Sequence, residues 1–222
     1  MNLEIKQFTW DVVDSNSWLV VEDGHGLLVD AVDSQDLFDT IAVLKDLIVI
    51  VTHCHFDHIV GLNKIRELRS DVKAISTEKC SEYLGNVHRN MSAIATTFVS
   101  FYDGEVKRNV KIEPFTCEKA DDTFDVIKEF EWYGHKVVLE AVYGHGDDGL
   151  LVILDNEYLF SGDTLLGIPT VTSFPRGSTK RFWAEDVPRL RKLSKSARTV
   201  YPGHGSPGEI ADMLGKIIKG RV

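Results

Sequence analysis

The sequence predicts an α/β protein in which two mixed β-sheets pack face to face, with helices on their outer sides. The main observation is that the chain has two halves, in each of which short apolar strands are followed by helices. No repeat, low-complexity tract or Pro/Gly/Ser-rich linker separates the halves. With 222 residues, 43% hydrophobic and 27% charged, the chain is long enough for one large core. We therefore predict a single domain over residues 1–222.

Composition and charge argue against nucleic acid and membranes as binding partners. A net charge of −9 has the wrong sign for neutralising the phosphates of nucleic acid, so nucleic-acid binding is not expected. The apolar run over residues 47–51 is far too short to span a membrane, and residues 1–6 lack the layout of a secretory signal. We expect a cytoplasmic protein that acts on a small-molecule substrate. Its oligomeric state stays open.

Strands dominate the first half of the chain. Residues 17–21 and 27–29 flank a turn-forming cluster and are typical of a hairpin. Ser34 is a candidate N-cap for a helix that continues to Leu44, because apolar residues recur there at helical spacing. The other elements that we predict in this half are a buried strand over 47–51, a helix from Asp57 or His58 to Leu68, and a strand over 72–76.

The second half follows the same order, with strands first and helices later. We predict strands over 124–132, 136–143, 150–154, 158–161 and 198–201, and helices over 179–196 and 209–219. Pro188 lies within the first of these helices and is expected to split or kink it. Residues 79–118 mix helix formers with the aromatic residues Phe98, Phe101 and Tyr102. They are interpreted either as a cap over a site or as an ordinary pair of surface helices.

The strongest functional signal comes directly after the buried strand, where His53, His55, Asp57 and His58 lie within six residues. Alternate side chains of an extended backbone share a face, so His53 and His55 can bind one ion while Cys54 points away. Asp57 and His58 lie where the chain turns into a helix, which directs them toward a second ion. Imidazole and carboxylate ligands together suit zinc, iron or manganese. The sequence therefore predicts a metal site.

Three later loops place a histidine or aspartate beside glycine at the end of a predicted strand. These residues are His145, Asp163 and His204. Glycine next to a ligand permits unusual backbone angles and a close approach of the chain. Since loops at one edge of the sheets can converge, we expect these three residues to join the same site.

Together these motifs resemble those of the metallo-β-lactamase-fold hydrolases, especially the glyoxalase II-like branch. The sequence is similar to that family at H-x-H-x-D-H (53–58), G-H (144–145), G-D-T (162–164), F-P-x-G-S (174–178) and P-G-H-G (202–205). The resemblance implies an αββα sandwich with a dinuclear centre of two divalent ions, zinc in the first place and iron or manganese otherwise. It implies that His53, His55 and His145 hold the first metal, that Asp57, His58 and His204 hold the second, and that Asp163 bridges them.

The resemblance also implies a reaction. A hydroxide that bridges the metals would attack a small ester, thioester or lactone, with Asp57 and Asp163 as the catalytic residues. Asp57 would orient the hydroxide, and Asp163 would keep the metals close. Two alternatives stay open. One is an iron-dependent persulfide dioxygenase-like oxidoreductase on the same scaffold, and the other is a binding or regulatory relative without turnover.

Several further residues are candidates with less support from motifs. Tyr143 is a candidate hydrogen-bond donor to substrate, with a packing role at the strand end as the alternative. Arg176 and Lys180 could bind a substrate carboxylate or phosphate, with surface charges as the equal alternative. Asp147 and Asp148 could tune the site or contact a cationic substrate, but a solvated turn is the favoured interpretation. The three cysteines are expected to be reduced and structural.

Overall fold

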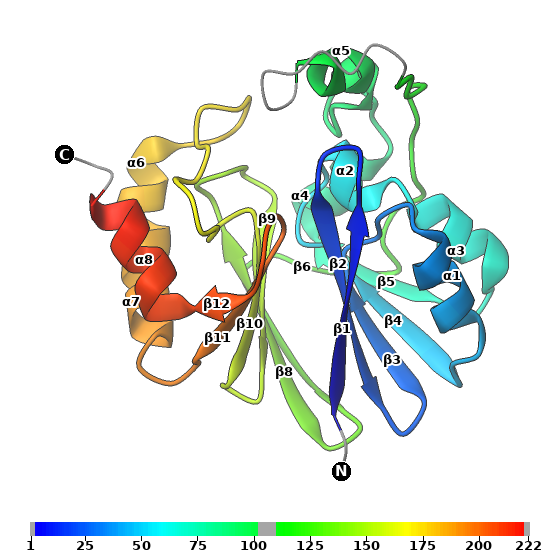
Figure 1. Ribbon diagram of the computed structural model, residues 1–222, viewed down its shortest axis with the longest axis horizontal. Coiled ribbons are helices and arrows are strands. Elements are labelled where there is room, and N and C mark those ends of the chain that lie inside the picture. Colours follow the sequence, from blue (N-terminus) through cyan, green and yellow to red (C-terminus); the bar gives the residue numbers. More distant parts are fainter. Residues whose placement is uncertain (1–2, 102–109, 220–222) are drawn as a thin grey trace. The chain divides into compact units, whose positions relative to one another are not determined.

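The computed structural model describes residues 3–101 and 110–219 (Figure 1). The chain divides into two compact units, Met1–Thr123 and Phe124–Val222. Each unit contains one six-stranded mixed sheet with its own helices. The predicted fold class, two mixed β-sheets flanked by helices, is therefore confirmed. The single domain over residues 1–222 stays a prediction.

The sheet of the first unit has the strand order β1-β2-β3-β4-β5-β6. Its strands are β1 (Glu4–Trp10), β2 (Ser15–Glu22), β3 (His25–Val29), β4 (Asp46–Ile50), β5 (Lys73–Thr77) and β6 (Asp122–Phe124). β1, β2 and β3 pair antiparallel, whereas β3, β4 and β5 pair parallel. The predicted hairpin is confirmed as β2–β3, and its two turn residues, Asp23 and Gly24, both have positive φ.

The helices of the first unit are short. They are α1 (Gln35–Ala42), α2 (Phe56–Ile59), α3 (Leu62–Leu68), α4 (Glu78–Leu84), the 3-10 turn η1 (Ser92–Ile94) and α5 (Ala95–Ser100). Ser34 caps α1 as predicted, because its hydroxyl oxygen accepts a hydrogen bond from the Leu37 N–H at 3.5 Å. The prediction of one continuous helix up to Leu68 is wrong, because the helix is interrupted near Gly61, between α2 and α3.

A close backbone approach explains the break at Gly61. Its N–H donates to the Ala31 carbonyl at 2.7 Å, and a Cβ at this position would lie 2.3 Å from the Val32 carbonyl oxygen. Only glycine fits so close to a neighbouring backbone. Helix α2, which contains the candidate ligands Asp57 and His58, is thereby followed by a close contact with the loop after β3.

Residues 79–118 contain α4, η1 and α5 within the described part of the chain. Phe101 is 69% exposed, whereas the Phe98 ring packs edge-on against Phe56 with the ring centroids 6.0 Å apart. Tyr102 lies outside the described residues. The cap over a site stays a prediction.

The second unit contains the other sheet, with the order β12-β11-β10-β9-β8-β7. Its strands are β7 (Ile127–Trp132), β8 (His135–Val142), β9 (Gly149–Leu154), β10 (Tyr158–Gly162), β11 (Thr199–Pro202) and β12 (Gly208–Glu209). β10 and β11 are parallel and the other pairs are antiparallel. The strand predicted over 124–132 is wrong as one element, because Phe124 ends β6 in the first sheet and Ile127 begins β7 in the second.

The long predicted helix of the second unit is split, as the position of Pro188 suggested. The segments are α6 (Thr179–Arg181), the π-helical turn η3 (Phe182–Asp186) and α7 (Val187–Leu193), and the chain later forms α8 (Ile210–Lys219). Proline lacks an N–H and clashes with the carbonyl four residues earlier. The wider π turn, in which the Val187 N–H donates to the Phe182 carbonyl, ends two residues before Pro188.

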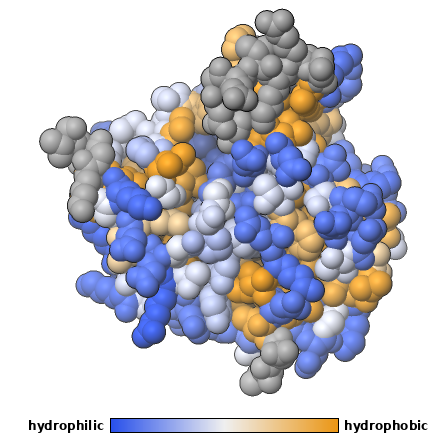
Figure 2. All heavy atoms as spheres, in the orientation of Figure 1, coloured by the Kyte–Doolittle hydropathy of each residue, from blue (hydrophilic) through white to orange (hydrophobic). Residues whose placement is uncertain are grey.

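Apolar side chains of β8–β11 and of η3, α7 and α8 form the core of the second unit. Leu151, Leu159 and Val200 from the sheet pack in one buried cluster with Leu190 and Leu214 from the helices. Figure 2 shows hydrophilic residues over much of the outer surface of these helices, as expected for amphipathic helices on a sheet. In the described part of the chain, no helix is both long and apolar enough to cross a membrane.

Candidate metal ligands

The first cluster of candidate ligands consists of His53, His55, Asp57 and His58, all in the first unit. His53 and His55 lie in the loop after β4, and Asp57 and His58 lie in α2. All four side chains are buried. Cys54 points away from them as predicted, since it is fully buried and its thiol donates to the Arg89 carbonyl at 3.4 Å.

Distances within the first cluster fit ligands of metal ions. The His53 ring centroid lies 4.6 Å from that of His55 and 4.2 Å from that of His58. His58 Nε2 lies 3.6 Å from Asp57 Oδ2. That separation is longer than a good N–H···O hydrogen bond. It is near the value of about 3.4 Å for two donor atoms that bind one zinc ion tetrahedrally.

Asp30, which the sequence interpretation did not select, organises this cluster. Its carboxylate accepts hydrogen bonds from His58 Nδ1 at 2.9 Å, the Thr52 hydroxyl at 2.8 Å and the Thr52 N–H at 2.7 Å. Because Nδ1 of His58 carries the proton toward Asp30, its Nε2 presents a lone pair. Burial raises the pKa of Asp30, and the interactions with His58 and Thr52 oppose this effect. The signal in the sequence was an aspartate directly after a strand, which here adopts φ 61°.

The second cluster consists of His145, Asp163 and His204, all in the second unit. They follow β8, β10 and β11 respectively. Asp163 Oδ2 lies 3.6 Å from His145 Nε2 and also 3.6 Å from His204 Nε2. One carboxylate oxygen at this distance from two imidazoles fits a group of candidate metal ligands.

The segment after β10 orients His145. Its Nδ1 donates to the Val171 carbonyl at 2.8 Å, which leaves Nε2 on the side of Asp163. The Phe174 ring packs edge-on against the imidazole, with the ring centroids 5.4 Å apart. Neither contact was predicted, because a backbone carbonyl and a ring contact leave no local pattern in the sequence.

The three predicted substrate-binding residues have different surroundings. The Arg181 guanidinium lies over the Tyr143 ring, 3.6 Å from its centroid. Arg176 Nε lies 3.5 Å from Asp147 Oδ1, and Lys180 is exposed in α6. Their role in binding substrate stays a prediction.

The expectation of a solvated turn at Asp147 and Asp148 is wrong for Asp148, which is 1% exposed. Its carboxylate folds back over Gly146, where a Cβ would lie 2.7 Å from Asp148 Oδ1. A side chain at position 146 would therefore require the Asp148 carboxylate to move. The three cysteines are free and buried, as expected.

The donor chemistry fits a divalent ion in both clusters. They supply imidazole nitrogens and carboxylate oxygens, the ligands typical of zinc, iron and manganese. These residues belong to groups that could hold a metal ion. Nδ1 of His58 donates to a carboxylate oxygen, and Nδ1 of His145 donates to a backbone carbonyl oxygen. Metal-binding histidines usually make such a hydrogen bond through the ring nitrogen that does not bind the metal.

A family model described as the metallo-beta-lactamase superfamily matches residues 10–204. The chain belongs to this superfamily. A probable metallo-hydrolase of Streptococcus pyogenes serotype M6 is 23% identical over 200 residues, which cover 87% of this chain and 80% of that relative. As a member of the superfamily, the chain has an enzyme-like fold whose relatives are generally hydrolases.

Two solved structures show the same fold at low identity. The B3 metallo-beta-lactamase BLEG-1 is 19% identical, with a TM-score of 0.77 over 96% of this chain and 97% of that one. The protein TTHA1623 in a di-iron-bound form is 21% identical, with a TM-score of 0.66 over 93% of this chain and 96% of that one.

Proposed function

We propose that this protein is a metal-dependent hydrolase of the glyoxalase II-like branch, which cleaves a small ester, thioester or lactone. The observation that carries the proposal is the position of Asp163, whose Oδ2 lies 3.6 Å from the Nε2 atoms of both His145 and His204. A non-catalytic relative has no chemical need for such an arrangement. The di-iron form of TTHA1623 supports two ions in this fold.

The assignment of ligands follows the family motifs. In this assignment His53, His55 and His145 would hold one ion, and Asp57, His58 and His204 would hold the other. Asp163 would be shared between the two ions, for which zinc is proposed in the first place. The hydrogen bonds that fix His58 and His145 support this assignment, because they direct the remaining ring nitrogen of each toward the other candidate ligands.

When bound, divalent ions supply a hydroxide nucleophile near neutral pH and stabilise the negative charge that develops on the substrate oxygen. The residues of the chain provide the rest. Asp57 orients the attacking water, and its place beside His58 Nε2 in α2 suits this role. Asp30 fixes the His58 ring and increases its basicity, since a buried carboxylate accepts the Nδ1 proton.

The test combines metal analysis with a panel of ester, thioester and lactone substrates. We expect about two equivalents of metal in the purified wild-type protein. Asp163→Ala should bind less metal and lose hydrolysis by a factor of at least about 100, because both ions lose a ligand. Asp212→Asn, which changes an exposed carboxylate of α8, is the matched control and should behave as wild type.

Near wild-type hydrolysis by Asp163→Ala would exclude the proposed mechanism. One bound iron together with oxygen consumption would replace it by the dioxygenase-like reaction. A protein that binds no metal when zinc is supplied, and whose stability does not change with a chelator, would indicate a relative without turnover.

A further inference from the structure

The π-helical turn Phe182–Asp186 directs a buried carboxylate toward the sheet of the second unit. The turn contains one more residue than a regular α-helical turn, since the Val187 N–H donates to the carbonyl five residues earlier. Such turns are rare and occur frequently at functional sites. Asp186, the last residue of the turn, is only 1% exposed although it is an acid on a peripheral helix.

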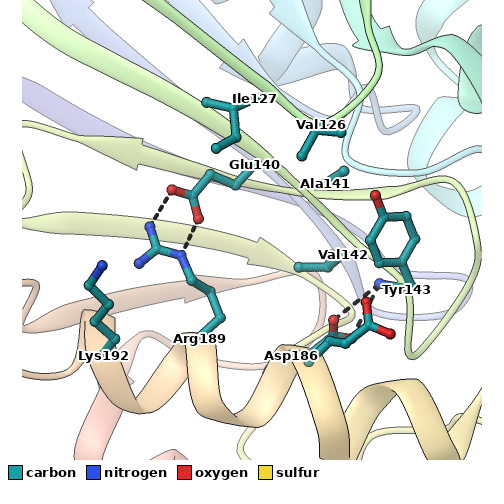
Figure 3. A pocket seen from close by; sticks show the side chains of 10 residues that line it. Val126, Ile127, Glu140, Ala141, Val142, Tyr143, Asp186, Arg189 and Lys192 are labelled. Atoms are coloured by element: carbon teal, nitrogen blue, oxygen red, sulfur yellow. Dashed lines mark hydrogen bonds and ion pairs between the residues drawn. The ribbon is translucent and has the colours of Figure 1, made fainter.

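The Asp186 carboxylate binds the backbone at the end of β8. Its Oδ2 accepts the Gly144 N–H at 2.7 Å, and its two oxygens lie 3.2 and 3.3 Å from the Tyr143 nitrogen (Figure 3). These are the two amides directly before His145. A carboxylate that accepts N–H groups forms stronger hydrogen bonds than a neutral acceptor, so this part of the backbone is firmly held.

Residues 171–178, which precede the π turn, bind the Gly144 carbonyl and the His145 ring. The Ser178 N–H donates to the Gly144 carbonyl at 2.8 Å, and the Val171 carbonyl accepts the His145 Nδ1 proton at 2.8 Å. Gly144 is therefore bound through both its N–H and its carbonyl, while the ring of the next residue is bound through Nδ1. Residues 171–186 thus fix both the main chain and the imidazole.

Glycines at positions 144 and 177 allow the backbone around His145 to pack closely against residues 171–186. A Cβ at Gly144 would lie 2.6 Å from both Asp186 Oδ2 and Phe182 Cδ2. A Cβ at Gly177 would lie 2.8 Å from the His145 carbonyl oxygen and 2.6 Å from that of Thr172. The two segments pack at distances that leave no space for a methyl group, so a displacement of the π turn would displace the His145 loop.

We propose that Asp186, presented by the π turn, is a positioning residue for His145. Asp186 is not one of the candidate metal ligands. It binds the main chain on the N-terminal side of His145, so that Nε2 is aimed before an ion arrives. This inference rests on the proposed function, because that proposal makes His145 a metal ligand.

The experiment measures the zinc affinity of the full chain by competition with a chromophoric chelator, for wild type, Asp186→Asn, Asp186→Ala, Asp212→Asn and His145→Ala. Partners that orient a metal-binding histidine typically contribute 10- to 100-fold in affinity. We expect a loss of about 10-fold for Asp186→Asn, which keeps one acceptor oxygen, and a larger loss, up to about 100-fold, for Asp186→Ala. Asp212→Asn should bind zinc as wild type does.

The melting temperature of each metal-free variant separates positioning from general stability. A purely structural Asp186 would lower the melting temperature and leave the zinc affinity of the folded protein unchanged, which would overturn the inference. Wild-type affinity in both Asp186 variants, with weaker binding by His145→Ala, would overturn the inference alone. Wild-type affinity in His145→Ala would overturn the proposed function as well. Asp186→Asn, which preserves the side-chain shape, keeps the test valid if Asp186→Ala does not fold.

Discussion

The two clusters of candidate ligands are held by buried aspartates that act in different ways. In the first cluster four candidate ligands come from one loop and one short helix, and Asp30 binds one of their side chains, that of His58, directly. In the second cluster three candidate ligands follow three different strands, and Asp186 binds the backbone before His145. Ligands that are neighbours in the sequence can be oriented through one side chain. Ligands that are dispersed need each loop to be fixed separately.

The largest effect is expected for Asp30→Ala. The substitution leaves the buried His58 Nδ1 and Thr52 N–H without their acceptor. A buried donor left without its acceptor typically lowers the free energy of unfolding by about 1–3 kcal/mol, so these two donors together give about 2–6 kcal/mol, and zinc affinity should fall about 10- to 100-fold. Urea denaturation and chelator competition measure the two effects. Asp33→Asn, an exposed neighbour, is the control.

This prediction tests the comparison of the two aspartates directly. If Asp30 acts on a ligand and Asp186 acts on the backbone, Asp30→Ala should reduce zinc affinity at least as much as Asp186→Ala. A smaller reduction for Asp30→Ala would reverse the order and show that fixing the dispersed loops matters more.

We expect Asp186 to make the free energy of unfolding depend on pH, by about 3 kcal/mol at most. Burial raises the pKa of Asp186 from 3.8 to about 6, against the N–H groups of Tyr143 and Gly144, with smaller effects from Glu185 and Arg181. The folded state therefore binds more protons between pH 4 and pH 6 than the unfolded state does. Its stability should fall as pH rises through this window, by about 1.4 kcal/mol for each unit of pKa difference.

Urea denaturation of the metal-free protein at pH 4, 5 and 6 measures this contribution as the difference between wild type and Asp186→Asn. In Asp186→Asn the decrease with rising pH should be smaller, because the titrating group is absent. Equal slopes in the two proteins would show that Asp186 has an ordinary pKa in the folded state.

The smallest effects are expected for alanine at the two close-packed glycines. Gly61→Ala places a methyl group against the backbone of Val32, which cannot move aside easily, so we expect a loss of about 2–3 kcal/mol in the free energy of unfolding. Gly144→Ala places a methyl group against Asp186 Oδ2 and against Cδ2 and Cβ of Phe182, and a loss of about 1–3 kcal/mol is expected.

Zinc affinity should show a different order for these two glycine variants. Gly144→Ala displaces the contact that positions His145, so its affinity should fall more than that of Gly61→Ala. A larger loss of zinc affinity in Gly61→Ala than in Gly144→Ala would show that zinc binding depends more on the backbone at Gly61, in the first unit.

Features determined by neighbouring residues were predicted from the sequence. The cap at Ser34, the β2–β3 hairpin and the candidate ligands at residues 53–58 each lie within a short segment. Long-range contacts determined the features that were missed. Asp30 and Asp186 reach residues far away in the chain, the break at Gly61 comes from the loop after β3, and the division of residues 124–132 depends on two different sheets.

The parallel pairing of β10 and β11 has a consequence for how this chain can vary. Gly162 lies opposite Pro202 in the register, and the Gly203 N–H donates to the Gly162 carbonyl at 2.8 Å. The separation of Asp163 and His204 is thus determined by neighbouring strands rather than by the length of chain between them. Insertions at the exposed turn after α7, around residues 194–196, can lengthen that connection while the distance between the two side chains is preserved.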